Sequence, residues 1–372
     1  MIVALEKELL PAGMRARFID GINGLRLHCL EMGFEAPGRP LLLLLHGFPE
    51  LAYSWRKVMP PLAAAGFHVV APDQRGYGRT TGCDADYDSD LASYRLTTLV
   101  EDAATLVAAL GHGSAAAVIG HDFGSSVAAW GALLRPEIFQ HLVLMSAPFG
   151  GAPRAAGANA MADLNDALGR LDPPRKHYQW YYSTRAADGD MRHCRQGIHA
   201  FLRAYFHMKS ADWPGNRPMP LKGWEAVELA RMPAYYIMPL AQTMAEAVAP
   251  AMPAPGEVAD CRWLPDADLS VYSGEFARTG FQGGLHWYRC GTDPACLLEL
   301  SQFAGRTIDV PTLFIGGAAD WGVQQAPGAF ARMQQTACTR FAGAHLVEGA
   351  GHWVQQEQPE QVAAALLDFL AR

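Results

Sequence analysis

Short, wholly apolar segments alternate with helix-length amphipathic segments over residues 41–145. A run of four or five apolar residues is too short for a helix, but it suits a strand that is buried on both faces of a sheet. Such runs occupy residues 41–45, 68–71, 115–119 and 142–145, and helical patterns lie near 54–65, 94–110 and 124–134. Strands that alternate with helices of this length form parallel sheets covered by helices on both faces. The sequence therefore predicts an α/β fold.

The alternation is interrupted in the middle of the chain. Residues 151–300 are rich in aromatic residues, Met and Pro, and they contain no clean buried strand. The Gly- and Ala-rich residues 150–160 are predicted to form a flexible exit from the sheet. We therefore predict one discontinuous α/β domain, residues 1–150 and 301–372, into which residues 151–300 insert a mainly helical domain.

Further elements of the α/β domain lie at both ends of the chain. Residues 14–33 alternate around Asn23-Gly24, a pair that favours a tight hairpin turn. After the interruption, strand-like runs appear at 312–317 and 344–348, and an amphipathic helix is expected at 359–370. Both ends of the chain therefore contribute to the predicted sheet.

Composition and charge argue against several classes of function. The chain has 372 residues, is 50% hydrophobic, and carries 30 basic and 37 acidic side chains, for a net charge of −7. A mildly acidic chain without a run of basic residues lacks the basic patch that is typical of proteins that bind nucleic acid. Seven scattered Cys without a CxxC pair fit neither a disulfide framework nor a zinc site, so we expect free thiols.

No targeting segment is expected from the first residues. Glu6, Lys7 and Glu8 stand where a signal peptide needs an apolar core. The most apolar run, residues 41–45, is far shorter than the roughly 20 residues that cross a bilayer. We therefore expect a cytoplasmic protein with no membrane partner. No pattern in the sequence bears on its oligomeric state.

The most informative motif is Gly120-His121-Asp122-Phe123-Gly124, which follows an apolar strand and opens a helix. This is the pattern of a nucleophile elbow, with Asp in the central place that Ser usually occupies. The turn is so tight that side chains two residues before and after the nucleophile would collide, which explains the glycines. We therefore predict that Asp122 is a catalytic nucleophile.

Two further polar residues follow predicted strands in an informative order. Asp320 comes just after the run at 312–317, and His352 just after the run at 344–348. Because open α/β sheets bind ligands beyond the carboxyl ends of their strands, we expect Asp122, Asp320 and His352 to meet there. The order nucleophile, acid, His suits a triad in which Asp320 orients His352 as the general base.

These motifs together resemble those of the epoxide hydrolases in the α/β-hydrolase superfamily, over nearly all of 1–150 and 301–372. The matching strings are HGFPE at 46–50, DQRGYGRT at 73–80, GHDFG at 120–124, GGAAD at 316–320 and GAGHW at 349–353. The resemblance implies an α/β-hydrolase core, a mostly parallel eight-stranded sheet, with an inserted, mainly helical cap. It also implies an oxyanion hole formed by the backbone N–H groups of Phe48 and Phe123.

The resemblance further implies two cap tyrosines that hold the epoxide oxygen and give it a proton. One is expected in a Tyr-Gln pair, which matches Tyr178-Gln179, and the other in a Trp-Tyr-Arg string, which matches Tyr288. The implied partners are a small apolar epoxide and water, with no cofactor and no metal.

The choice of Asp as nucleophile points to a class of reaction. A carboxylate suits attack on an sp³ carbon that bears a leaving group, and it forms an alkyl ester. Water activated by His352 would then hydrolyse this ester on Asp122, with the oxyanion held by backbone amides. Attack on an ester or amide is disfavoured because it would give an anhydride.

Two leaving groups fit this scheme, an epoxide oxygen and a halide. An opening epoxide develops an alkoxide that needs a proton donor, and a phenol of pKa about 10 can serve. A halide needs convergent N–H donors instead. Phe123 stands where related enzymes commonly have Trp, and it supplies no such donor. We therefore favour an epoxide hydrolase over a haloalkane or haloacid dehalogenase. A binding protein on a retired hydrolase scaffold is a third alternative, disfavoured by the complete triad.

The remaining motifs are given structural interpretations. We expect Asp73 and Arg75 to brace a turn near the site, and His121 to be a buried histidine with satisfied hydrogen bonds. Residues His193, His199 and His207 do not have the spacing of a helical metal pair. The Pro-rich segment 211–270 is long for a cap of this family and is expected to form an ordered but irregular lid.

Overall fold

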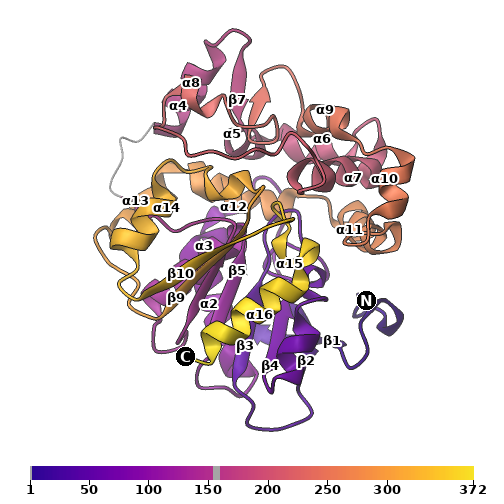
Figure 1. The fold of residues 1–372 in the computed structure, drawn as a ribbon, viewed down its shortest axis with the longest axis vertical. Helices are drawn as coiled ribbons and strands as arrows, with labels where there is room; N and C mark the ends of the chain where they lie inside the picture. Colours follow the sequence, from indigo (N-terminus) through magenta and orange to yellow (C-terminus); the bar gives the residue numbers. More distant parts are fainter. Residues whose placement is uncertain (1, 154–159) are drawn as a thin grey trace.

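An eight-stranded sheet runs through the centre of the molecule, in the computed structural model that describes residues 2–153 and 160–372 (Figure 1). Of the predicted exit segment 150–160, residues 154–159 lie outside the described residues. The strands, in their order across the sheet, are β1 (Arg15–Ile22), β2 (Leu25–Met32), β4 (His68–Pro72), β3 (Leu41–Leu45), β5 (Ala117–His121), β6 (Leu142–Met145), β9 (Thr312–Gly317) and β10 (Phe341–Val347). The predicted eight-stranded sheet is therefore confirmed.

The central strand β3 shows why the sequence folds in this way. All five of its leucines are buried, between β4 on one side and β5 on the other. The strands from β4 to β10 pair in parallel, whereas β1 and β2 form an antiparallel hairpin at one edge. The hairpin turns at Asn23 and Gly24, both with positive φ, as the sequence predicted.

Helices cover both faces of the sheet. α2 (Leu96–Ala109) and α3 (Phe123–Leu134) pack together on one face, and α1 (Met59–Ala64) and α16 (Pro359–Leu370) lie on the other (Figure 1). The helix predicted over 54–65 is wrong as one element, because it divides into a 3₁₀ turn (Ala52–Trp55) and α1. Pro60 and Pro61 lack N–H donors and fit only the first turn of a helix, so α1 begins just before them.

The chain between β6 and β9 forms a helical layer beyond the carboxyl ends of the parallel strands, in the upper half of Figure 1. Its helices are α4 (Ala160–Gly169), α5 (Tyr178–Tyr182), α6 (Ala186–Arg192), α7 (Gly197–Lys209), α8 (Ala226–Leu229), α9 (Met244–Val248), α10 (Pro255–Asp260), α11 (Asp266–Thr279), α12 (Gln282–Thr292) and α13 (Pro294–Ser301). Contrary to the prediction, this layer also contains strands, β7 (Arg175–His177) and β8 (Ile237–Pro239), which pair antiparallel. Each has three residues, too few for a periodic pattern to identify.

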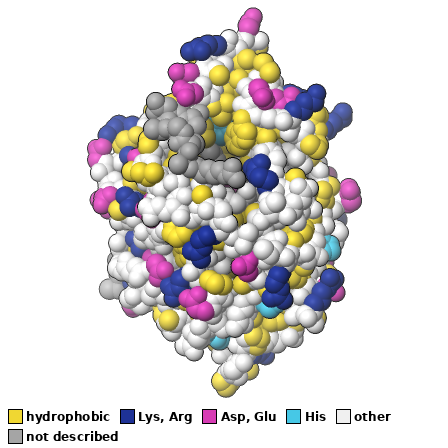
Figure 2. All heavy atoms as spheres, turned by 90° about the vertical axis from the view of Figure 1, so that its left-hand side faces the viewer, with side chains coloured by type: hydrophobic (Ala, Val, Ile, Leu, Met, Phe, Trp, Pro, Cys, Tyr) yellow, Lys and Arg dark blue, Asp and Glu magenta, His cyan; other side chains and the backbone are white. Residues whose placement is uncertain are grey.

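On the face shown in Figure 2, basic and acidic side chains are interspersed rather than segregated. Within the described residues, no helix combines the length and the apolar character that a membrane crossing requires.

Candidate active site

Asp122 lies in a sharp turn between β5 and α3. Its backbone has φ 53° and ψ −119°, a strained conformation for a residue other than glycine. A Cβ atom on Gly120 would lie 2.1 Å from the carbonyl oxygen of Gly124, and one on Gly124 would lie 2.3 Å from that of Leu45. The two glycines therefore permit the turn that presents Asp122, for the steric reason that the sequence suggested.

Asp320 and His352 reach Asp122 from the two neighbouring strands β9 and β10. His352 Nδ1 lies 3.1 Å from Asp320 Oδ1, and its Nε2 lies 3.3 Å from Asp122 Oδ2. The second contact is too poorly aligned for a regular hydrogen bond. All three side chains are buried. The structure thus brings together the three residues predicted as a triad, in the geometry of nucleophile, base and orienting acid.

The carboxylate of Asp122 is held in its ionised form. Burial favours the neutral acid, but the contact with His352, its charge and that of Lys209 outweigh burial and hold the pKa of Asp122 below its usual range. The Phe48 amide donates a hydrogen bond of 3.0 Å to Asp122 Oδ1. Among the described residues, the Asp122 side chain accepts none from the first turn of α3, so the predicted second donor, the Phe123 amide, is unengaged.

A buried ion pair lies behind the triad. His121 Nδ1 is 2.5 Å from Glu50 Oε2, and its Nε2 is 2.7 Å from the carbonyl oxygen of His352. Burial opposes protonation of His121, but the charge of Glu50 prevails and raises the pKa of His121. This histidine is therefore satisfied and fixes the backbone at His352. Sequence analysis missed Glu50, although it ends the string HGFPE.

The two predicted tyrosines, Tyr178 on α5 and Tyr288 on α12, lie on the side of Asp122 that the helical layer covers. The Tyr288 ring packs edge-on against the rings of Phe48 and Phe123, with centroids 5.5 and 5.4 Å apart, and against Tyr178 at 5.9 Å. Burial, and then the charge of Asp122, raise the pKa of both phenols well above its ordinary value. Both hydroxyls therefore keep their protons at neutral pH.

At the motif 73–78, the structure differs from the expected brace between Asp73 and Arg75. Asp73 does brace its turn, because it accepts hydrogen bonds from the amides of Ala52 (2.9 Å) and Arg79 (3.0 Å). Arg75 pairs instead with Asp102 on α2, at 2.7 and 2.9 Å. The expected Asp–Arg brace is therefore wrong. The partner of Arg75 is a residue of a separate helix, which the local sequence could not indicate.

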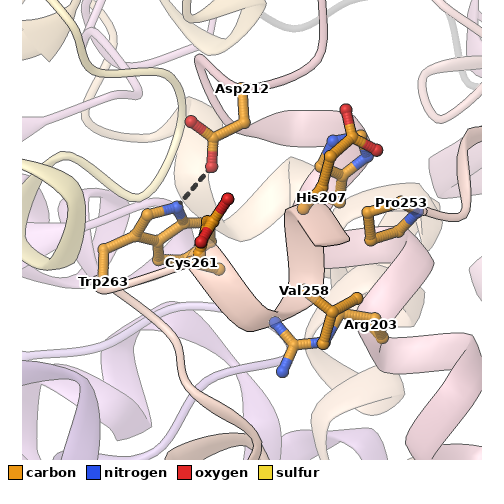
Figure 3. A pocket seen from close by; sticks show the side chains of 9 residues that line it. Arg203, His207, Asp212, Pro253, Val258, Cys261 and Trp263 are labelled. Carbon is orange, nitrogen blue, oxygen red and sulfur yellow. Dashed lines mark hydrogen bonds between the residues drawn. The ribbon is translucent and has the colours of Figure 1, made fainter. Parts of the chain in front are cut away.

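A hollow of about 290 Å³ lies in the helical layer (Figure 3). It is lined by residues that include Arg203, His207, Asp212 and Trp263, and the Trp263 indole donates to Asp212 at 2.7 Å. None of the predicted site residues lines it. Across residues 2–153 and 160–372, no group of three or more His, Cys, Asp or Glu side chains is arranged to hold a metal ion.

Comparison with known proteins agrees with this fold and geometry. A family profile described as the alpha/beta hydrolase fold matches residues 40–359. Epoxide hydrolase A of Mycobacterium tuberculosis is 36% identical over 366 residues, which cover 95% of this chain and 96% of that protein. This chain therefore belongs to the epoxide hydrolase family of the alpha/beta hydrolases.

Solved structures show the same likeness. An epoxide hydrolase from an endophytic Streptomyces matches with a TM-score of 0.77 and 33% identity, covering 97% of this chain and 96% of that one. Epoxide hydrolase A from Mycobacterium thermoresistibile matches with a TM-score of 0.75 and 33% identity, covering 96% and 98%. The match in both cases includes the helical layer as well as the sheet.

Proposed function

We propose that this protein hydrolyses an epoxide to a vicinal diol, through an alkyl ester on Asp122. The observation that carries the proposal is the pairing of an ionised carboxylate with proton donors above it. Asp122 lies between the amide of Phe48 and the imidazole of His352, and the Tyr288 ring contacts the rings of Phe48 and Phe123 that flank the carboxylate. A nucleophile below and acids above match what ring opening requires.

In the first step, a carboxylate oxygen of Asp122 attacks an epoxide carbon, and the C–O bond of the ring breaks. The departing oxygen takes a proton from Tyr288 or Tyr178. A tyrosinate is costly in a buried site, which is why the pKa of both phenols is high. However, the negative charge of Asp122 disappears as the ester forms, so the number of buried charges does not increase. The proton donation is thereby coupled to the attack.

In the second step, His352 takes a proton from water, and the resulting hydroxide attacks the carbonyl carbon of the ester. Asp320 holds His352 Nδ1 and stabilises the imidazolium. The negative charge that develops on the Asp122 oxygen meets the Phe48 amide, and the Phe123 amide is free to join it. When the tetrahedral intermediate breaks its bond to the alkoxide, the alkoxide takes the proton of the His352 imidazolium and leaves as the diol. The Asp122 carboxylic acid that remains returns its proton to the tyrosinate, which restores both side chains.

We further propose that residues 1–150 and 301–372 form the catalytic domain and residues 151–300 the cap. This division assigns the nucleophile, base and acid to one domain and both tyrosines to the other. Apolar and aromatic side chains around Tyr288, including Tyr182 at a ring distance of 5.0 Å, suit a small apolar epoxide.

The geometry gives no support to a dehalogenase. Halide release needs N–H donors that point to the leaving group. Phe123 has no side-chain donor, and the Trp287 indole N–H already donates to the carbonyl oxygen of Arg75 at 3.0 Å.

The deciding experiment is the intact mass of a His352→Ala variant after exposure to mixed epoxides and bromoalkanes. Without the base, the ester should accumulate, and the protein should gain the mass of one whole epoxide, located on Asp122 by peptide mapping. An Asp122→Ala/His352→Ala variant is the matched control and should gain nothing. A gain equal to an alkyl group without its halogen would replace the proposal with dehalogenation.

A further inference from the structure

The two tyrosines above Asp122 differ in what their hydroxyl groups bind. The Tyr178 hydroxyl donates a hydrogen bond of 3.0 Å to Gln325 Oε1 and accepts one of 3.1 Å from Gln179 Nε2. The Tyr288 hydroxyl makes no hydrogen bond to any group in the described part of the chain, although its ring is buried. One phenol proton is therefore already committed to a protein acceptor, and the other is available.

The acceptor of the Tyr178 proton comes from the loop that carries the triad acid. Gln325 lies just after the short 3₁₀ helix η5 (Trp321–Val323), which Asp320 caps by accepting a hydrogen bond of 2.6 Å from the amide of Gly322. The amide of the preceding residue, Gln324, donates to the carbonyl oxygen of Trp321 at 2.9 Å. The loop is thus fixed next to the triad, and Gln325 reaches from it to Tyr178 at the start of α5.

We propose that Gln325 is a positioning residue that competes with the epoxide oxygen for the proton of Tyr178. The proposal rests on the proposed function. The substrate oxygen binds first to the free hydroxyl of Tyr288. It receives the second hydrogen bond only when the Tyr178 hydroxyl rotates away from Gln325. Gln179 keeps donating to the Tyr178 oxygen throughout, so the phenol stays oriented while its proton changes acceptor.

The strength of this competition depends on the acceptor at position 325. A neutral amide is a modest acceptor, a carboxylate forms hydrogen bonds about twice as strong, and an alkyl group accepts none. Gln325→Leu, the wild type and Gln325→Glu therefore form a series of increasing acceptor strength at one position. If Gln325 competes, substrate binding should weaken along this series in that order.

The test measures KM, kcat and the single-turnover rate of ester formation with styrene oxide. We expect Gln325→Leu to lower KM about threefold and Gln325→Glu to raise it about tenfold. In single turnovers, which do not need His352 as a base, the loss in Gln325→Glu should shrink as the pH falls toward the pKa of the introduced carboxyl. Gln324→Glu is the matched control, because Gln324 lies in the same loop and makes no side-chain hydrogen bond to Tyr178. Its KM should stay within twofold of the wild type.

A second set of variants separates competition from a general structural role. In a Tyr178→Phe background no proton remains to compete for, so both substitutions at Gln325 should leave KM unchanged. Equal effects in both backgrounds, or a shift of KM in the same direction for Leu and Glu, would overturn the proposal and leave the proposed function intact. A wild-type protein that forms neither diol nor ester on Asp122 would overturn both.

Discussion

The side of the site formed by the sheet differs from the side formed by the helical layer. On the sheet side, each group has fixed partners: Asp122 contacts the Phe48 amide and His352, and His352 contacts Asp320. On the helical side, the Tyr288 hydroxyl has no partner in the described residues, and the Tyr178 hydroxyl donates to Gln325, a bond that the proposed competition requires it to release. In the proposed mechanism the nucleophile is therefore prepared before substrate binds, whereas the acids complete their hydrogen bonds only with the substrate.

This difference follows from where the groups are attached. The triad residues follow β5, β9 and β10, parallel strands of one sheet that hydrogen bonds hold together through β6 and with each other. The tyrosines lie on helices of 5 and 11 residues whose positions depend on aromatic packing. Because these short helices are held by side-chain packing rather than by a hydrogen-bonded sheet, we expect the helical side to be the more adaptable half of the site.

Removal of the nucleophile should have the largest effect. We expect Asp122→Ala to lower diol formation more than about 10³-fold, because the other carboxylate beside His352, that of Asp320, contacts Nδ1 on the opposite edge of the ring from Asp122. Diol formation measured by chromatography, with circular dichroism as a check of folding, tests this. Retention of more than a tenth of the activity would show that a water molecule attacks the epoxide directly.

The two tyrosines should differ in a second, smaller effect. Tyr288→Phe removes the available proton and should slow ester formation about 10²-fold, within the range for general acids. Tyr178→Phe removes a proton that is already shared with Gln325 and should cost about tenfold. Stopped-flow single turnovers measure both rates, with Tyr181→Phe as a control on the same helix that bonds Asp190 instead. Equal losses for the two variants would contradict the difference in their hydrogen bonds.

The helical layer should lose stability in mildly acidic solution. Burial lowers the pKa of His177 to about 4, so the folded protein favours neutral His177. In the unfolded chain, His177 binds a proton near pH 6.5. The contribution of neutral His177 to the free energy of unfolding is therefore complete above that pH and is lost as the pH falls toward 4. At pH 5 the loss should be about 2 kcal/mol. The lowered pKa values of Asp122 and Asp320 preserve their contributions until the pH falls below about 4.

Urea unfolding at pH 7 and pH 5 checks this expectation. The free energy of unfolding should fall less between these pH values in a His177→Gln variant than in the wild type. A His141→Gln variant, altered beside β6 of the sheet, serves as the control. An identical pH dependence in all three proteins would exclude His177 as the source.

Sequence analysis predicted the sheet side of the site better than the helical side. Asp122, Asp320 and His352 each follow a strand, and the carboxyl ends of parallel strands share one edge, so local patterns place them together. No comparable rule places Gln325 against Tyr178 or Asp102 against Arg75, because those contacts join distant segments through tertiary packing. The short elements of 211–270, such as α8 with four residues, are likewise below the length at which periodicity is informative.

The strands that flank the insertion lie next to each other in the sheet. β6 pairs directly with β9, in parallel, so the whole helical layer is one long crossover connection between neighbouring strands. A parallel pair cannot be closed by a tight turn, so some connection of this kind is obligatory. The sheet fixes only the two end points of that connection, and the entropy of closing a loop rises slowly with its length. Evolution can therefore enlarge, shorten or replace this segment, and so change what the enzyme admits, without moving the nucleophile.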